Sequence, residues 1–109
     1  MNNLSGLTSL DVSGNAVRGT LVALPSTLTF LDVESNMLGG SPFNSELILA
    51  LTNLQQLHIS TNAFTGRIPT ELGKLLKLEE LWMANNRFEG STIPTQLGNL
   101  QNLGTLRHG

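Results

Sequence analysis

The chain has 109 residues, of which 13% are charged, with a formal net charge of −2 and no cysteine. This length allows one small domain. The charge balance has no basic excess to hold a phosphate backbone, which argues against nucleic-acid binding. The lack of cysteine excludes disulfides, thiolate metal ligands and cysteine nucleophiles. No run approaches 18 apolar residues and the first residues lack the pattern of a secretory leader, so neither is expected in this chain.

Leucine is the commonest residue, with 22 copies that never gather into a run. Their spacing repeats the pattern L-x-x-L-x-x-L-x-L-x-x-N-x-L-x-G, which indicates a repeat array. The asparagines of the pattern are 21, 26 and 24 residues apart: Asn15, Asn36, Asn62 and Asn86. We expect one array of about four and a half units without terminal caps. The approximate units are residues 4–27, 28–50, 51–74, 75–99 and a truncated 100–109.

Each part of the unit has a structural reason. The L-x-L core alternates with period two, which predicts a short strand with one buried face, and the preceding leucines at a spacing of three predict a 3-10 turn. The asparagine amides are expected to form a ladder between stacked turns. Residues 44–51 start with a capping candidate and predict two helical turns. The glycines allow tight bends or close approach between coils: Gly19, Gly40, Gly66 and Gly90.

Residues 51–75 and 75–100 follow this pattern almost throughout, including Ile68-Pro69 and Ile93-Pro94. The sequence here resembles the leucine-rich repeat family, and within it the plant-type class of receptor-like kinases and receptor-like proteins. The resemblance implies an α/β solenoid, a right-handed coil with a short-stranded parallel sheet on its concave face. The convex side would be 3-10, irregular or short helical. Unit two departs most, with Ser41-Pro42 in place of Ile-Pro.

The residues between the strand leucines are expected to point out onto the concave face. One column there runs from acidic residues through histidine and tryptophan to arginine, and a second adds a phenylalanine and a glutamate. A third column, which includes Ser60, adds another glutamate. These residues are the candidates for contact with a partner: Trp82, His58, Asp32, Asp11, Phe30, Glu34, Glu80 and Arg107.

Each candidate has a functional and a plain interpretation. Trp82 is expected to be exposed and to contact a partner, or else to lie flat over His58 or Arg107 as a shield. The carboxylates of Asp11, Asp32 and Glu34 form an acidic binding patch near the N-terminal end, or else are merely solvated. Like charges this close repel one another unless a cation or a basic group lowers the repulsion. His58, expected to be exposed, is a candidate pH sensor or an ordinary surface side chain.

Catalysis is not expected. The sequence has no nucleophile elbow, no phosphate-binding loop, no dinucleotide fingerprint and no H-E-x-x-H motif. Asp11 and Asp32 are the one plausible carboxylate pair, and an open sheet face does not separate two pKa values as acid-base catalysis requires. We therefore predict no enzyme activity, no catalytic residues, no cofactor and no metal site.

The expected function is a protein- or peptide-binding module, a fragment of a longer receptor-like or inhibitor-like repeat protein. Two alternatives remain open: structural spacer repeats without contacts of their own, and part of the ectodomain of a receptor-like kinase. Uncapped ends would favour end-to-end self-association. The compartment is not determined; a complete chain would be cytoplasmic, and a receptor fragment would be extracellular or at the cell surface.

Overall fold

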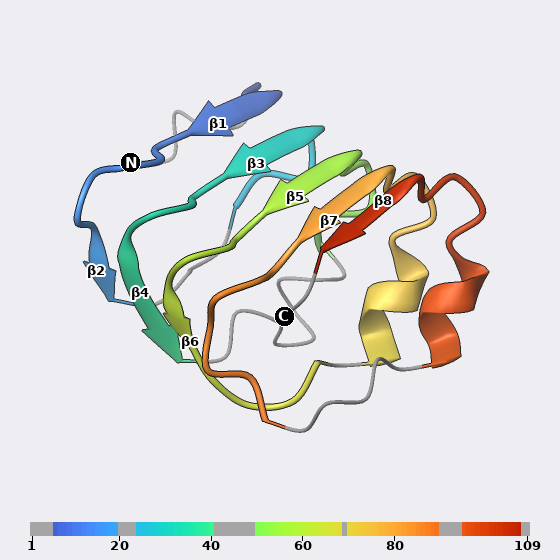
Figure 1. The fold of residues 1–109 in the computed structure, drawn as a ribbon. Coiled ribbons are helices and arrows are strands. Elements are labelled where there is room, and N and C mark those ends of the chain that lie inside the picture. Colours follow the sequence, from blue (N-terminus) through green and yellow to red (C-terminus); the bar gives the residue numbers. More distant parts are fainter. Residues whose placement is uncertain (1–5, 20–23, 41–49, 69, 90–94, 108–109) are drawn as a thin grey trace.

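The computed structural model describes residues 6–19, 24–40, 50–68, 70–89 and 95–107. Within these residues, eight short strands and two 3-10 helices follow one another (Figure 1). The strands are β1 (Ser9–Asp11), β2 (Arg18–Gly19), β3 (Phe30–Asp32), β4 (Met37–Gly40), β5 (Gln56–His58), β6 (Ala63–Phe64), β7 (Glu80–Trp82) and β8 (Thr105–Arg107). The helices are η1 (Thr70–Lys74) and η2 (Thr95–Asn99).

Five strands, one from each unit, form a parallel sheet in the order β1-β3-β5-β7-β8. Figure 1 shows them side by side along the top of the molecule, with the two 3-10 helices stacked at the right. The chain therefore coils once per unit and returns to the same sheet, as the sequence pattern predicts. This arrangement confirms the expected solenoid. We call the face of this sheet that points away from the leucine core the concave face.

The leucine pattern produces a continuous core because its members point to the same side in every coil. Leu31, Leu57 and Leu81, the central residues of β3, β5 and β7, are at most 4% exposed. Val33, Ile59 and Met83 follow them two residues later and are equally buried. Burying a side chain of this size contributes about 1.5–3 kcal/mol, so the stacked columns supply most of the stability of the fold.

Tight turns lead into the strands of the sheet. Leu54 donates its backbone N–H to the carbonyl of Leu51, three residues earlier, over 3.1 Å, and Leu78 repeats this bond to Leu75 over 3.0 Å. These are bonds of the 3-10 type, which the leucine spacing predicts. Before β3 a proline, Pro25, stands where the other turns have their first leucine, and Leu28 donates its backbone N–H to the Pro25 carbonyl over 3.2 Å. The turn survives because it needs only the carbonyl of that residue.

A second, smaller sheet was not predicted. β2, β4 and β6 pair in parallel at the far end of each coil, at the lower left of Figure 1. Two of these strands have only two residues, which is too short for any periodicity to register in the sequence. The expected helix over 44–51 lies outside the described residues, apart from Ala50 and Leu51.

Among the described residues, positive backbone φ angles recur in the segments that follow β1, β3, β5 and β7. Gly19, Gly40 and Gly66 adopt φ values of 107°, 74° and 85°, which a residue without a Cβ reaches freely. This agrees with the bends expected from the sequence; Gly90 lies outside the described residues. Thr61 and Asn85, each just before a ladder asparagine, also have left-handed φ values, of 58° and 57°. The bend is therefore enforced by the coil even where the residue type disfavours it.

Gly73 lets η1 approach η2 closely. A Cβ built on Gly73 would lie 2.5 Å from the carbonyl oxygen of Gln96, whereas a Cβ on Gly98, its counterpart in η2, meets no atom within 4 Å. We expect Gly73→Ala to lower the free energy of unfolding by about 1–3 kcal/mol, since the two helices must separate. Gly98→Ala is the matched control and should leave it nearly unchanged. Urea denaturation followed by circular dichroism measures both, and equal midpoints for the two variants would contradict this close approach.

Candidate functional site

The register of the large sheet brings the candidate residues into rows that cross the strands. Each strand contributes one residue to each row, because parallel neighbours pair without a shift. One row consists of Asp11, Asp32, His58, Trp82 and Arg107, and the next of Ser9, Phe30, Gln56, Glu80 and Thr105. The columns expected from the sequence are thus confirmed as neighbours in space. The side chain of Arg107 lies outside the described part of the chain.

His58 occupies the centre of the first row and is only 6% exposed, so the expectation of an exposed histidine was wrong. The indole of Trp82 stacks on the imidazole with ring centroids 3.9 Å apart and planes 8° from parallel. On the other side the ring of Phe30 meets it edge-on at 5.4 Å. Strands about 4.8 Å apart allow large neighbours to lean over a smaller ring. Alternation along one strand cannot reveal such covering by adjacent strands.

Two carboxylates face the imidazole from opposite sides. His58 Nε2 lies 3.0 Å from Glu80 Oε1, a hydrogen bond between β5 and β7. Its other nitrogen, Nδ1, lies 3.7 Å from Asp32 Oδ2 on β3. The side chain of Asp32 is 14% exposed and that of Glu80 is 33% exposed. The histidine therefore links three strands of the concave face through its two nitrogens.

Trp82 is half-buried rather than exposed. Its stacking on His58 corresponds to the shielding arrangement that the sequence left open as the alternative for this residue. The stack also presents a flat apolar surface at the middle of the concave face, beside the half-buried Phe30. Shielding of the histidine and an apolar contact surface are therefore compatible in this geometry.

Asp11 and Asp32 are direct register partners, as expected. Hydrogen bonds from the Ser13 backbone N–H (3.0 Å) and then from its hydroxyl (2.7 Å) lower the pKa of the Asp11 carboxyl. In the next coil, Asp32 Oδ1 accepts the backbone N–H of Glu34 over 3.0 Å. Each carboxylate is thus held by donors of its own turn. The two acidic groups can lie on adjacent strands because of these local bonds.

Ser60, expected to point outward from the sheet, is 8% exposed. Its hydroxyl oxygen accepts the backbone N–H of Ala84 from the next coil over 3.0 Å. Ser60 therefore joins two coils just after β5 and contributes little to the accessible surface. The sequence offers no signal for this role, because serine is common at both exposed and bonded positions of turns.

The ladder asparagines form hydrogen bonds within and between coils. Asn36 Oδ1 accepts backbone N–H groups from Asn15 and Val17, 3.1 and 2.9 Å away in the preceding coil. Asn62 and Asn86 make the same kind of bonds to Leu38 and Phe64. Their Nδ2 atoms donate to strand-end carbonyls of their own coil and of the coil before. These amides replace the backbone partners that the turn lacks, so we assign them a structural role.

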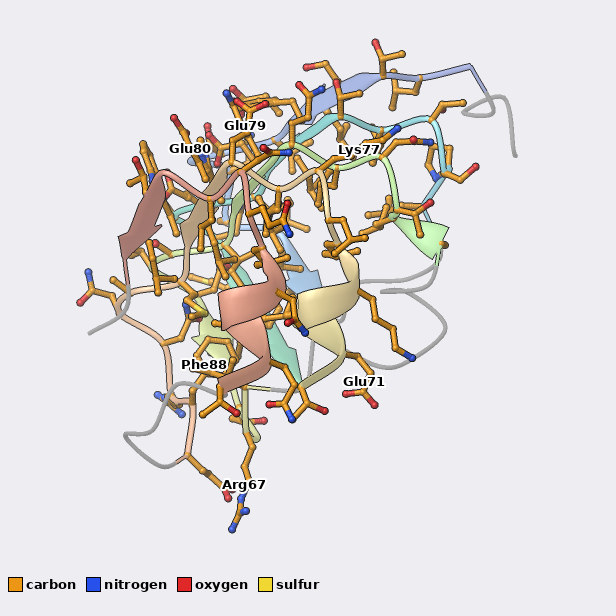
Figure 2. All side chains as sticks on the ribbon, turned by 90° about the vertical axis from the view of Figure 1, so that its right-hand side faces the viewer. Arg67, Glu71, Lys77, Glu79, Glu80 and Phe88 are labelled. Carbon is orange, nitrogen blue, oxygen red and sulfur yellow. The ribbon has the colours of Figure 1, made fainter. Side chains whose placement is uncertain are left out.

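Acidic side chains lie on more than one side of the molecule. Figure 2 shows Glu79 and Glu80 at the large sheet and Glu71 on η1. The basic Arg67 lies at the opposite end of the coil. Asp32, Glu34 and His58 are distinguished from the other acidic groups by their convergence. One potential ligand atom from each lies within 4.8 Å of the others.

The part of the chain that the structure describes holds no helix with the length and hydrophobicity needed to span a membrane.

Comparison with known proteins agrees with this geometry. The family model for the Leucine Rich Repeat matches residues 53–75 and 77–100. Receptor-like protein 41 of Arabidopsis thaliana is 36% identical over 105 residues, which cover 94% of this chain and 12% of that protein. The chain therefore spans about an eighth of the length of this relative.

Two solved structures share the fold. The ectodomain of the Arabidopsis thaliana receptor kinase GASSHO1/SCHENGEN3, in complex with CASPARIAN STRIP INTEGRITY FACTOR 2, superposes with a TM-score of 0.84 at 35% identity. The superposition covers 94% of this chain and 13% of that ectodomain. The plant peptide hormone receptor RGFR1, in complex with RGF2, gives a TM-score of 0.81 at 31% identity, over 96% of this chain and 17% of its own. With the parallel sheet and the repeated asparagines, these matches identify the chain as a leucine-rich repeat solenoid of the class found in plant receptor-like proteins.

Proposed function

We propose that the concave face binds a short extended peptide or protein segment that carries basic groups, as part of a receptor-like repeat protein. The observation that carries this proposal is the arrangement around His58. Trp82 and Phe30 offer half-buried aromatic surface at the centre, and the carboxylates of Asp11 and Glu80 lie around it. An apolar centre with a polar rim is the usual anatomy of a binding surface, and tryptophan is the residue type most enriched at its energetic centre.

The size and charge of the face indicate which kind of ligand it would bind. Five strands span about 20 Å, which suits a short peptide better than a folded partner. Asp11, Asp32, Glu34 and Glu80 give the face an acidic character, which complements lysine and arginine. The complex of the plant peptide hormone receptor RGFR1 with RGF2 supports a peptide as the ligand. The proposal places this face outside the cell, as in the ectodomains that share the fold.

A peptide selection tests the proposal. The immobilised chain is panned against a displayed library of random dodecapeptides, and enriched peptides are resynthesised and measured by fluorescence anisotropy. We expect enrichment of lysine and arginine. The double variant Trp82→Ala/Asp32→Ala should weaken binding at least about tenfold, because it removes an aromatic contact and a charge from the same surface.

The matched control removes the same kinds of side chain elsewhere. Leu76 is 58% exposed beside η1, and Glu71 lies on η1 itself. The variant Leu76→Ala/Glu71→Ala should bind within about twofold of the unmodified chain, and circular dichroism checks that both double variants are folded. Equal binding by both double variants would overturn the proposal and favour the spacer alternative, in which these coils only shape a longer array.

A further inference from the structure

We propose that His58 Nδ1, with carboxylate oxygens of Asp32 and Glu34, forms a binding site for a divalent transition-metal cation of the zinc type. No metal site was expected from the sequence, since the histidine lies in a different repeat from the two acidic residues and meets them through the register of β3 and β5. The site shares Asp32 and Glu34 with the acidic surface of the proposed peptide site, but its test uses zinc alone, so the two proposals can fail separately.

The ligand atoms are already near coordination distance. One atom each from Asp32, Glu34 and His58 lies within 4.8 Å of the others, and the Asp32 Oδ2 to His58 Nδ1 distance is 3.7 Å. Zinc bonds of about 2.0–2.2 Å in tetrahedral geometry place neighbouring ligand atoms about 3.3–3.6 Å apart. Binding would therefore need only small side-chain adjustments and no change of the backbone.

The second carboxylate contact of His58 leaves Nδ1 as the nitrogen available to a cation. Glu80 Oε1 lies 3.0 Å from Nε2. An ionised carboxylate only accepts hydrogen bonds, so Nε2 carries the proton and Nδ1 presents its lone pair. A carboxylate on the far nitrogen is the arrangement that orients metal-bound histidines in proteins. Glu80 would thus be the positioning residue of the site.

A carboxylate oxygen also faces Nδ1, from the strand on the other side of His58. The His58 side chain is 7% exposed, and no described residue gives Nδ1 a hydrogen bond. Its neighbour is a carboxylate oxygen at 3.7 Å, which is too far for a hydrogen bond. A lone pair that faces an anionic oxygen is unfavourable unless a cation or a proton bridges the two.

The surrounding contacts hold these atoms in place before any cation binds. Asp32 Oδ1 accepts the Glu34 backbone N–H over 3.0 Å, which turns Oδ2 toward the histidine. Trp82 stacks on one side of the imidazole and Phe30 meets it edge-on, so the ring has little freedom to rotate. A ligand set with fixed rotamers loses little conformational entropy on binding.

The types of the three ligand atoms indicate which metal ion the site would bind. One imidazole nitrogen with two carboxylate oxygens suits zinc and similar borderline ions, whereas calcium and magnesium favour all-oxygen ligands. Three protein ligands leave a fourth tetrahedral position, which water would occupy from the half-buried side of Asp32 and Glu34. The competing arrangement has no metal: a doubly protonated His58 would bridge Asp32 and Glu80 as an ion pair.

Zinc titration of the whole, untagged chain tests the site with two readouts. Isothermal titration calorimetry with ZnCl₂ should give one equivalent bound, with no saturable binding of CaCl₂ or MgCl₂ under the same conditions. The chain has a single tryptophan, Trp82, stacked on His58, so its fluorescence should change over the same zinc range. A titration with no saturable heat and no change in Trp82 emission up to millimolar zinc would overturn the proposal and favour the ion pair.

The variants separate this site from other zinc binding. Asp32→Asn should weaken zinc binding at least tenfold, and Glu34→Gln should do the same without touching the Asp32–Glu34 backbone bond. Asp11→Asn is the matched control, because Asp11 occupies the same row one coil away with Ser13 in place of Glu34. His108→Gln controls for the second histidine of the chain. Equal affinities for Glu34→Gln and Asp11→Asn, or loss of binding only in His108→Gln, would contradict the assignment.

Discussion

Replacing Leu75 by alanine is expected to lower the free energy of unfolding by about 2–5 kcal/mol. Leu75 is 1% exposed and lies between η1 and β7, within the continuous leucine core. Its backbone already bonds to the Leu72 carbonyl and receives the Leu78 N–H, so the substitution removes side-chain packing and leaves the turn intact. The loss combines the transfer energy of the deleted carbons with the cavity they leave.

The next residue is the matched control. Leu76 is 58% exposed, so Leu76→Ala removes the same atoms without opening a cavity and should change stability by less than about 0.5 kcal/mol. Urea denaturation, followed by both circular dichroism and Trp82 fluorescence, measures the difference. Comparable destabilisation by the two variants would contradict the assignment of inward and outward positions in this turn.

The second large effect is expected for Asn62→Ala, at about 2–4 kcal/mol. Asn62 Oδ1 accepts the Leu38 backbone N–H over 3.1 Å. Its Nδ2 lies 2.9 Å from the Val33 carbonyl and within 3.3 Å of the carbonyls of Ile59 and Ser60. Alanine would leave these backbone groups without their partner between two coils, and buried groups of this kind are costly to leave unsatisfied.

Asn15 provides the comparison for Asn62. It is exposed, and its amide donates only to the carbonyls of Val12 and Ser13 in its own coil. Water can replace these bonds, so Asn15→Ala should cost less than about 1 kcal/mol. Thermal or urea denaturation of both variants tests whether the ladder stabilises the solenoid by linking coils. Equal costs would show that the bonds between coils add nothing.

The architecture could be predicted from the sequence because it depends on periodic positions. The leucines fix which side of each strand faces the core, and the asparagines mark where each strand ends. Repetition then places Asp11 beside Asp32 and His58 beside Trp82 without knowledge of the detailed packing. Local patterns are sufficient in a solenoid, since each coil contacts mainly its neighbours.

Features that depend on side-chain size across strands could be predicted only in part. Trp82 over His58 was one of two interpretations left open, whereas the edge-on contact of Phe30 and the resulting burial of His58 were not expected. The close approach at Gly73 requires the spacing between η1 and η2, which the motif does not contain. The convergence of Asp32, Glu34 and His58 similarly depends on which rotamers the covering rings allow.

The most direct test of the concave face as a binding surface is chemical-shift mapping of the ¹⁵N-labelled chain with an enriched basic peptide. If the peptide binds the concave face, we expect the largest amide shifts in β3, β5 and β7, together with the indole N–H of Trp82, and little change in η1 and η2. Shifts concentrated in η1, η2 or the small sheet of β2, β4 and β6, with an unperturbed Trp82, would contradict it.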